Sequence, residues 1–195
     1  MEEKKISAKK IIINILSYLL IVILLLLLGV KLNFAKVAVD GQSMNPTLVG
    51  TSFEGYEYGY TDRFLYKIGG LDRYDIVVVR QNTTDDLWIK RIIGMPNETI
   101  QIKDGSVYIN DELLDSDPFK DIKISNPGLA SEKIALGDNE YFVMGDNRNN
   151  SRDSRVIGKI NKKQIYGRGF ISRGICDIST CKGEIKKHDF EFKGW

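Results

Sequence analysis

The hydrophobic pattern of the chain begins with one long apolar run. From Ile11 to Val30 there is no charged residue, and Ile, Leu and Val predominate. About 20 residues at ~1.5 Å rise per residue cross a hydrocarbon core of ~30 Å. The run therefore predicts a transmembrane helix. A cleaved secretory signal is the alternative, but the run exceeds a typical signal core and residues 31–36 contain no clear small-x-small cleavage site.

Lysines are unevenly distributed around this run. Four precede it and two follow it closely: Lys4, Lys5, Lys9, Lys10, and then Lys31 and Lys36. Positive charge near a membrane helix stays on the cytoplasmic side. We therefore expect residues 1–10 in the cytoplasm, residues 11–30 as the anchor in the cell membrane, and residues 31–195 as an extracytoplasmic domain.

Short β-type segments follow the anchor, separated by turn formers. They are Ile76–Val79, Leu87–Ile93, Thr99–Ile102, Val107–Ile109, Tyr141–Met144 and Ile165–Ile171. Asp104-Gly105 lies between the third and fourth segments and predicts a hairpin there. The fold class is therefore mainly β, after one transmembrane helix. Residues 50–70, rich in glycine and tyrosine, are expected to form an exposed loop.

The composition of the chain argues against a nucleic-acid partner and against a metal site. The chain has 28 Lys and Arg against 26 Asp and Glu, a net charge of +2, so no nucleic-acid partner is indicated. Two cysteines, Cys176 and Cys181, and one histidine, His188, argue against a metal site. In an exported domain the cysteines either form a disulfide or remain thiols.

Nucleophilic catalysis needs a nucleophile and a base to accept its proton. His188 lies in a charged tail, where a solvated surface position is the simpler interpretation, and no G-x-S-x-G motif accompanies it. A buried lysine loses its proton near neutral pH, whereas arginine does not. Lys90 lies in an apolar β segment, where alternation places it with Trp88 and Ile92. Alternation alone does not choose Lys90 over Arg91, and a lysine extending from a strand edge to solvent is the structural alternative.

Ser43 is the candidate nucleophile. It lies between Gly41 and Pro46, where glycine permits a sharp backbone path, although a serine in a turn commonly has only a turn role. About 13 residues separate it from Val30, which is at most ~47 Å of extended chain. Ser43 should therefore lie near the membrane surface.

Four segments resemble the ordered sequence boxes of the type I signal peptidases, the serine/lysine peptidases that cut signal peptides from exported proteins. The segments are Ser43–Thr47, Tyr74–Val78, Lys90–Pro96 and Gly145–Arg155. One box alone is weak evidence, but four in order behind an anchor are specific. The resemblance extends from Ile11 to about Phe170.

This resemblance implies the roles of the site residues. Ser43 would be the nucleophile and Lys90 the base, with Ser151 hydrogen-bonded to the lysine. Asp153 and Arg155 resemble a structural ion pair of the family, and Asp146 and Arg148 resemble supports for the loop that carries Ser151. Without the family resemblance, these four charged residues could equally be ordinary turn residues.

Gly41 departs from the family pattern. Some members have serine or threonine at this position as a side-chain donor to the oxyanion, so the second donor is unassigned here. Glycine is instead explained if the backbone adopts a positive φ.

The implied activity is that of a membrane-bound serine endopeptidase that cleaves secretory preproteins after small residues through an acyl-enzyme, with no cofactor and no metal. A self-cleaving repressor-type serine/lysine peptidase is the nearest enzyme alternative, disfavoured by the anchor. A non-catalytic anchored β module is the alternative outside enzymes, and in it Ser43 and Lys90 would be replaceable.

Overall fold

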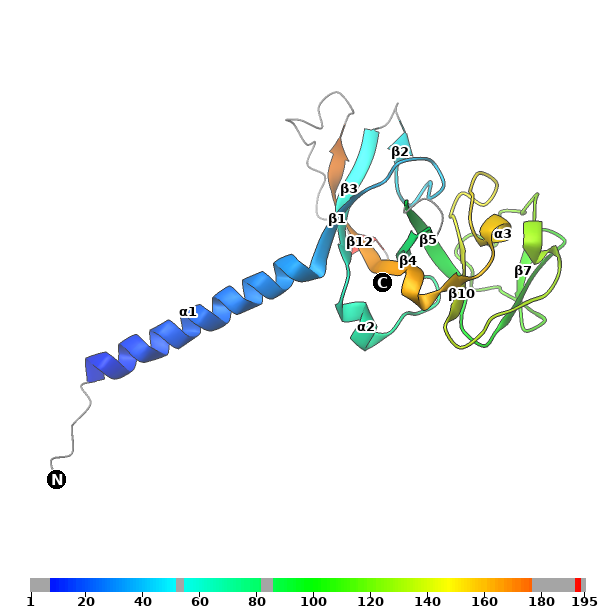
Figure 1. The fold of residues 1–195 in the computed structure, drawn as a ribbon. Coiled ribbons are helices and arrows are strands. Elements are labelled where there is room, and N and C mark those ends of the chain that lie inside the picture. Colours follow the sequence, from blue (N-terminus) through cyan, green and yellow to red (C-terminus); the bar gives the residue numbers. More distant parts are fainter. Residues whose placement is uncertain (1–7, 52–54, 82–85, 177–191, 194–195) are drawn as a thin grey trace.

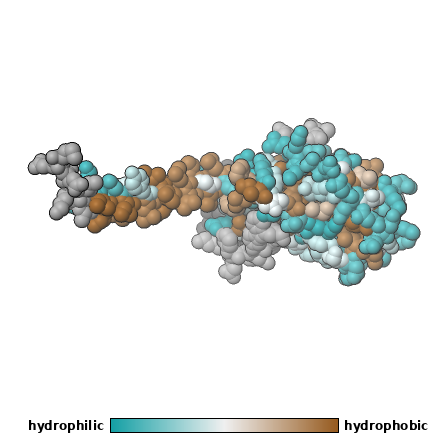
Figure 2. Space-filling view, turned by 90° about the horizontal axis from the view of Figure 1, so that it is seen from below, coloured by the Kyte–Doolittle hydropathy of each residue, from teal (hydrophilic) through white to brown (hydrophobic). Residues whose placement is uncertain are grey.

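The computed structural model describes residues 8–51, 55–81, 86–176 and 192–193. Helix α1 (Ala8–Asn33) projects from a β-rich body (Figure 1). Its described side chains up to Leu32 are exposed, and a continuous apolar surface covers much of it (Figure 2). Within the described residues it is the one helix long and apolar enough to cross a membrane. It begins and ends three residues outside the predicted run.

The body contains two antiparallel sheets. The larger sheet has nine strands in the order β1-β3-β12-β4-β5-β10-β11, with β2 paired to β3 and β13 to β12. Its strands are β1 (Phe34–Ala38), β2 (Gly50–Thr51), β3 (Gly55–Asp62), β4 (Ile76–Arg80), β5 (Leu87–Gly94), β10 (Glu140–Met144), β11 (Ile160–Asn161), β12 (Ile165–Cys176) and β13 (Phe192–Lys193). The mainly β fold expected from the sequence is confirmed.

The smaller sheet has four strands in the order β8-β7-β6-β9. They are β6 (Thr99–Lys103), β7 (Ser106–Ile109), β8 (Glu112–Leu113) and β9 (Ile134–Ala135). Short helical segments complete the body: α2 (Leu65–Gly69), η1 (Gly128–Ser131), α3 (Ser154–Ile157) and η2 (Lys162–Gln164).

The unbroken apolar run in β4 is explained by burial on both faces. Ile76 and Val78 pack into one hydrophobic cluster, with Met44 and Leu48, whereas Val77 and Val79 pack into another. A strand covered on both sides shows no alternation of polar and apolar residues. The strand β4 is therefore a rigid central support, and its neighbour β5 carries Lys90.

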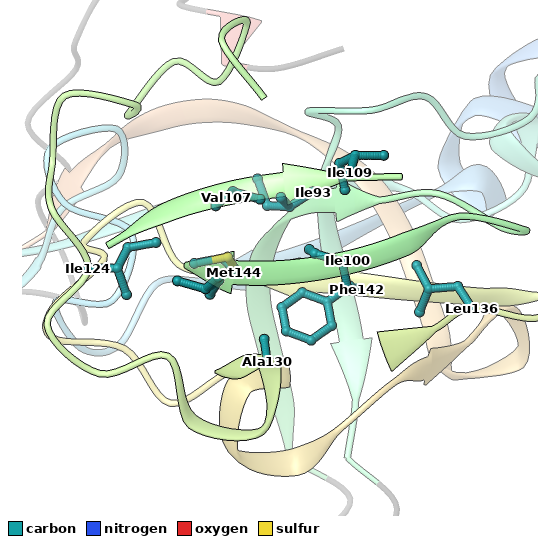
Figure 3. Close-up of a cluster of buried hydrophobic side chains, with 10 residues drawn as sticks. Ile93, Ile100, Val107, Ile109, Ile124, Ala130, Leu136, Phe142 and Met144 are labelled. Atoms are coloured by element: carbon teal, nitrogen blue, oxygen red, sulfur yellow. The ribbon is translucent and has the colours of Figure 1, made fainter. Parts of the chain in front are cut away.

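The predicted hairpin is confirmed. Strands β6 and β7 pair from Ile100 with Ile109 to Lys103 with Ser106. Asp104 and Gly105 form the connection with positive φ angles of 51° and 73°. Apolar residues of the hairpin pack against Ile93 of β5 and Phe142 of β10 (Figure 3). This third cluster joins the smaller sheet to the larger one.

The expectation of an exposed loop over residues 50–70 is wrong for most of that segment. Strand β3 pairs with β1 on one side and β12 on the other, and α2 follows it. The buried face of β3 carries Glu57, Gly59 and Thr61 in place of apolar residues. An alternation of buried and exposed positions is present, but hydrophobicity does not reveal it. Cys181 and His188 lie outside the described residues, as does the Cys176 side chain.

Candidate active site

Ser43 lies in a turn that is fixed to the core on both sides. The Met44 and Leu48 side chains are fully buried in the cluster beneath the turn. The Leu48 N–H donates to the Met44 carbonyl at 3.0 Å, and the Gly41 N–H donates to the Gly50 carbonyl at 2.8 Å. Gly41 has a φ of +95°, a conformation that strains any residue with a Cβ atom. The glycine is therefore explained by the backbone path that presents Ser43.

Lys90 reaches Ser43 from the middle of β5. Its Nζ lies 2.8 Å from Ser43 Oγ and 2.8 Å from the Ile89 carbonyl oxygen. The side chain is only 4% exposed, and the ammonium contacts the Trp88 ring. Burial lowers the pKa of Lys90 to about 8, although Asp153 and Asp146 act in the opposite direction. The structure thus brings together a hydroxyl and an amine that loses its proton at mildly alkaline pH.

An open cleft of about 420 Å³ gives access to this pair. Residues 38–44 line one side and residues 87–90 the other, with Asn150 and Arg152 at the rim. Strand β1 pairs with β3 along one edge, and its other edge is unpaired among the described strands. Strand β10 pairs with β5 only from Arg91 onward, so residues 87–90 leave that edge of β5 open. Two strand edges therefore face the cleft. A larger cleft beside α2 contains neither Ser43 nor Lys90, and we place the candidate active site in the smaller one.

Asp146 connects the two chain segments that carry the pair. Its fully buried carboxylate accepts hydrogen bonds from Arg91 Nε and Nη2 at 2.7 and 2.6 Å. The Thr47 hydroxyl donates to the same carboxylate at 2.6 Å. Arg91 follows Lys90 in β5, and Thr47 belongs to the Ser43 turn. This ion pair therefore fixes the distance between the lysine strand and the serine turn.

Asp153 and Arg155 form a buried ion pair of their own. Arg155 Nη2 lies 2.7 Å from Asp153 Oδ2, which also accepts a hydrogen bond from the Gly145 N–H. Burial on its own would raise the pKa of Asp153, but hydrogen bonds and charge from Arg155 hold the pKa below its ordinary value. Arg155 also donates to the Arg148 carbonyl, which ties the loop between them to α3.

Arg148 pairs with a residue that the sequence did not single out. Its guanidinium forms two hydrogen bonds with Asp117, and both side chains are almost fully buried. Arg148 and Asp146 thus have separate partners, and the two are joined only through the Arg148 N–H and the Asp146 carbonyl. Asp117 follows β8 in the smaller sheet, so this pair connects that sheet to the loop of Ser151.

Ser151 is half-buried beside the serine turn, and its hydroxyl oxygen is shielded from solvent. A Cβ atom on Gly145 would overlap Ser151 Oγ and the Ser43 carbonyl oxygen, so all three groups meet at one point. The Asn147 N–H donates to that same carbonyl at 3.1 Å. The Ser151 hydroxyl lies near the Asp153 carboxylate but forms no well-aligned hydrogen bond with any described residue. The expected hydrogen bond to Lys90 is not formed in this conformation.

Three residues of this network escaped the sequence analysis as site residues: Arg91, Thr47 and Asp117. Arg91 had a detectable signal, because an arginine inside an apolar strand requires a buried carboxylate partner. Thr47 and Asp117 lie in segments typical of turns, where sequence alone indicates no long-range partner. Among the described residues no group of three or more His, Cys, Asp or Glu side chains is placed to hold a metal ion.

The chain is similar in sequence to proteins of one known family. Residues 12–172 match the family model described as signal peptidase, peptidase S26. Signal peptidase I S of Bacillus subtilis (strain 168) is 36% identical over 86% of this chain and 91% of its own length. Signal peptidase IB of Staphylococcus aureus (strain COL) is 31% identical over 82% and 87%, respectively. A crystal structure of a signal peptidase I from Enterococcus faecalis V583 aligns at 28% identity over 50% of this chain and 95% of that one, with a TM-score of 0.42.

Proposed function

The chain belongs to the signal peptidase family, peptidase S26, a family of serine endopeptidases, and we propose that it cleaves the signal peptides of secretory preproteins with Ser43 and Lys90 as a catalytic dyad. The observation that carries the proposal is the 2.8 Å distance between Lys90 Nζ and Ser43 Oγ at a nearly buried lysine. No metal or cofactor takes part in the steps proposed below.

The first step is acylation. When Lys90 is protonated, Nζ donates to Ser43 Oγ; when it is neutral, the serine hydroxyl donates to the nitrogen lone pair. Ser43 Oγ then attacks the scissile carbonyl carbon while its proton passes to Lys90. The tetrahedral intermediate collapses as Lys90 returns the proton to the leaving amine. Water subsequently attacks the ester, again with Lys90 as base, and releases the acid and free Ser43.

The oxyanion of the intermediate requires hydrogen-bond donors. The Ser43 N–H has no acceptor among the described residues and is therefore available for this role. A side-chain donor at Gly41 is absent from this sequence. An extended substrate would pair with the open edges of β1 and β5, and small pockets beside Ser43 would select small residues before the cut.

The buried charges around the dyad are proposed as positioning residues. Asp146 holds the Ser43 turn through Thr47 and the Lys90 strand through Arg91. Asp153 and Arg155 hold Gly145 and the Arg148 carbonyl, and thereby the loop of Ser151. Ser151 would orient Lys90 in a conformation in which its hydroxyl, unpartnered here, turns to the lysine. Asp146, Arg148, Asp153 and Arg155 would not touch the substrate.

The place of action follows from the anchor. The helix α1 is long and apolar enough to anchor the chain in a membrane. The lysines at the N-terminal end support a cytoplasmic N-terminus, with residues 31–195 as the catalytic domain outside. Ser43 is then held close to the membrane, where the end of a substrate's inserted signal emerges.

The test is cleavage of a preprotein by the full chain purified in detergent, followed by sequencing of the new N-terminus. Ser43→Ala and Lys90→Met should each abolish cleavage while leaving a folded protein, because nucleophile and base act as a unit. Asp115→Asn, which changes an exposed ion pair on the smaller sheet, serves as the matched control. Substantial processing by a folded Lys90→Met variant would refute the dyad.

A further inference from the structure

A cleft beside α2 is larger than the candidate active site and is separate from it. Its volume is about 950 Å³, which lies within the usual range for small-molecule sites. It extends from Leu32 at the end of α1, along α2, to η2 and the start of β12. Five of its lining residues are cationic and none is acidic: Arg63, Lys67, Arg80, Lys162 and Lys163.

No described carboxylate forms an ion pair with Arg63, Lys67, Lys162 or Lys163. The guanidinium groups of Arg63 and Arg80 lie 4.8 and 5.6 Å from the same Tyr166 ring. Like charges gathered in one cleft repel one another, so an anion that binds there relieves an existing electrostatic cost.

The carboxylate of Asp62, which precedes Arg63 in the sequence, is engaged by the backbone. Asp62 is buried, and its two oxygens accept hydrogen bonds from the N–H groups of Phe64, Leu65 and Tyr66 at 2.8–2.9 Å. Asp62 therefore stabilises the first turn of α2. It does not extend into the cleft to neutralise the lysines.

The cleft is fixed to the end of the apolar helix. Asn33, the last residue of α1, accepts hydrogen bonds from the Arg63 N–H on its carbonyl and from the Phe64 N–H on its side chain. A bilayer that surrounds α1 has its headgroups at this level, because Leu32 is the last apolar residue of the helix. The cationic cleft therefore lies at the height of lipid phosphates.

An apolar surface continues from α1 onto α2. Phe64, Leu65 and Ile68 are exposed by 57%, 53% and 77%, respectively, and Lys67 lies between them in sequence. Exposed apolar residues next to cations are typical of segments that lie in the membrane interface. The acyl chains of a lipid would contact the exposed apolar residues, and its headgroup would contact the cations of the cleft.

We propose that this cleft binds the headgroup of an anionic phospholipid from the leaflet at the C-terminal end of α1. The phosphate lies among Arg63, Lys67, Lys162 and Lys163, and the amide side chains of Asn161 and Gln164 are placed to bond the remaining headgroup oxygens. The acyl chains run past Leu32 along α1. Such a lipid holds the β body at a fixed height and tilt over the bilayer.

A lipid fits this cleft better than a soluble anion does. A free phosphate would use the cations but leave Phe64, Leu65 and Ile68 exposed to water. A lipid uses both surfaces, and α1 keeps its local concentration high. The inference does not depend on the chemistry of Ser43 and Lys90, because no residue of the cleft lines the candidate active site.

The test uses native mass spectrometry of the full chain in detergent with added phosphatidylglycerol, phosphatidylcholine or sn-glycerol 3-phosphate. The variant Lys67→Gln/Lys162→Gln/Lys163→Gln removes three cations of the cleft. The control Lys103→Gln/Lys120→Gln/Lys133→Gln removes three exposed cations of the smaller sheet and its adjoining segments. Lys67→Arg/Lys162→Arg/Lys163→Arg retains the charge and shows whether a loss reflects misfolding.

The wild type, the control and the arginine variant should retain phosphatidylglycerol in preference to phosphatidylcholine. The glutamine variant in the cleft should bind it about fivefold more weakly for each cation removed. Equal retention of the two lipids by the wild type, or equal phosphatidylglycerol binding by the two glutamine variants, would overturn the proposal. Binding of sn-glycerol 3-phosphate as tight as that of the lipid would also overturn it, because the site would then bind a free phosphate ester.

Discussion

Arg91 and Asp146 form a two-pronged buried ion pair directly behind the Ser43–Lys90 pair. The hydrogen bonds measure 2.7 and 2.6 Å, and the Arg91 side chain is 10% exposed and that of Asp146 not at all. The pair joins β5 to the loop after β10, and Thr47 adds the serine turn. Three segments distant in sequence therefore meet at one carboxylate.

Asp146→Asn should strongly destabilise the protein. The change leaves the Arg91 guanidinium buried without a charged partner, which costs about 3–5 kcal/mol. For a chain of this size the thermal midpoint should fall by roughly 6 °C or more. Thermal unfolding of the full chain in detergent measures this, with Asp115→Asn in the exposed Lys120 pair as control. Equal midpoints for the two variants would show that the buried pair contributes no net stability.

The rate of cleavage should rise with pH through about 8. The neutral form of Lys90 is the base, and its pKa is lowered to about 8 by burial. The neutral fraction grows about tenfold between pH 7 and pH 9. The kcat/KM profile of the free enzyme measures this dependence. A rate that is independent of pH across this interval would contradict a titrating lysine base.

Lys90→Met should stabilise the fold near neutral pH while abolishing activity. Below pH 8 the lysine is charged in both the folded and unfolded chains, so its full burial cost applies, up to about 3 kcal/mol. Between pH 8 and 10.5 the unfolded chain binds more protons, so the wild type gains stability with rising pH. The difference between variant and wild type should therefore shrink toward pH 10.5. Thermal midpoints of both proteins at pH 7 and pH 10 test this, and a constant difference would contradict it.

Gly41→Ser and Gly41→Ala should both slow acylation. Open space surrounds the position where a Cβ atom would stand, so the cost comes from the φ of +95° and not from a clash. Strain of this kind is worth roughly 1–2 kcal/mol. Single-turnover acylation of the two variants side by side separates the alternatives. If serine is clearly faster than alanine, its hydroxyl reaches the oxyanion, and a rate above that of the wild type would show that this gain outweighs the strain.

Gly145→Ala should lower activity by separating Ser151 from the serine turn. The new methyl group would overlap Ser151 Oγ and the Ser43 carbonyl, and it would come within 2.6 Å of Ser151 Cβ. One segment must therefore move, and a shift of about 1 Å in a catalytic group costs on the order of 100-fold in rate. Gly69→Ala, where the methyl group meets no atom within 4 Å, is the matched control. Activity of Gly145→Ala equal to that of this control would show that the close approach is dispensable.

The sequence alone determined the elements whose signals are local. The apolar run predicted α1, and the β-branched runs predicted β4 to β7 and β10, because burial selects residue type over a few neighbouring positions. The four segments that resemble the family's sequence boxes are local signals as well, and through them the sequence predicted Ser43 and Lys90 as site residues. Strand β3 was missed, since its buried face carries Glu57, Gly59 and Thr61, which resemble loop residues in composition.

Only the tertiary structure decided which distant groups meet. Ser43 and Lys90 are 47 positions apart and become neighbours because β4 pairs with β5 beneath the buried Met44 and Leu48. Arg148 was predicted as a support of the Ser151 loop without a partner of its own, and folding of the smaller sheet brings Asp117 to it across 31 positions. The cationic cleft likewise combines α2 with η2, about a hundred residues later. Such contacts depend on strand order and register, and the sequence around a charged or polar residue does not indicate which distant residue it will contact.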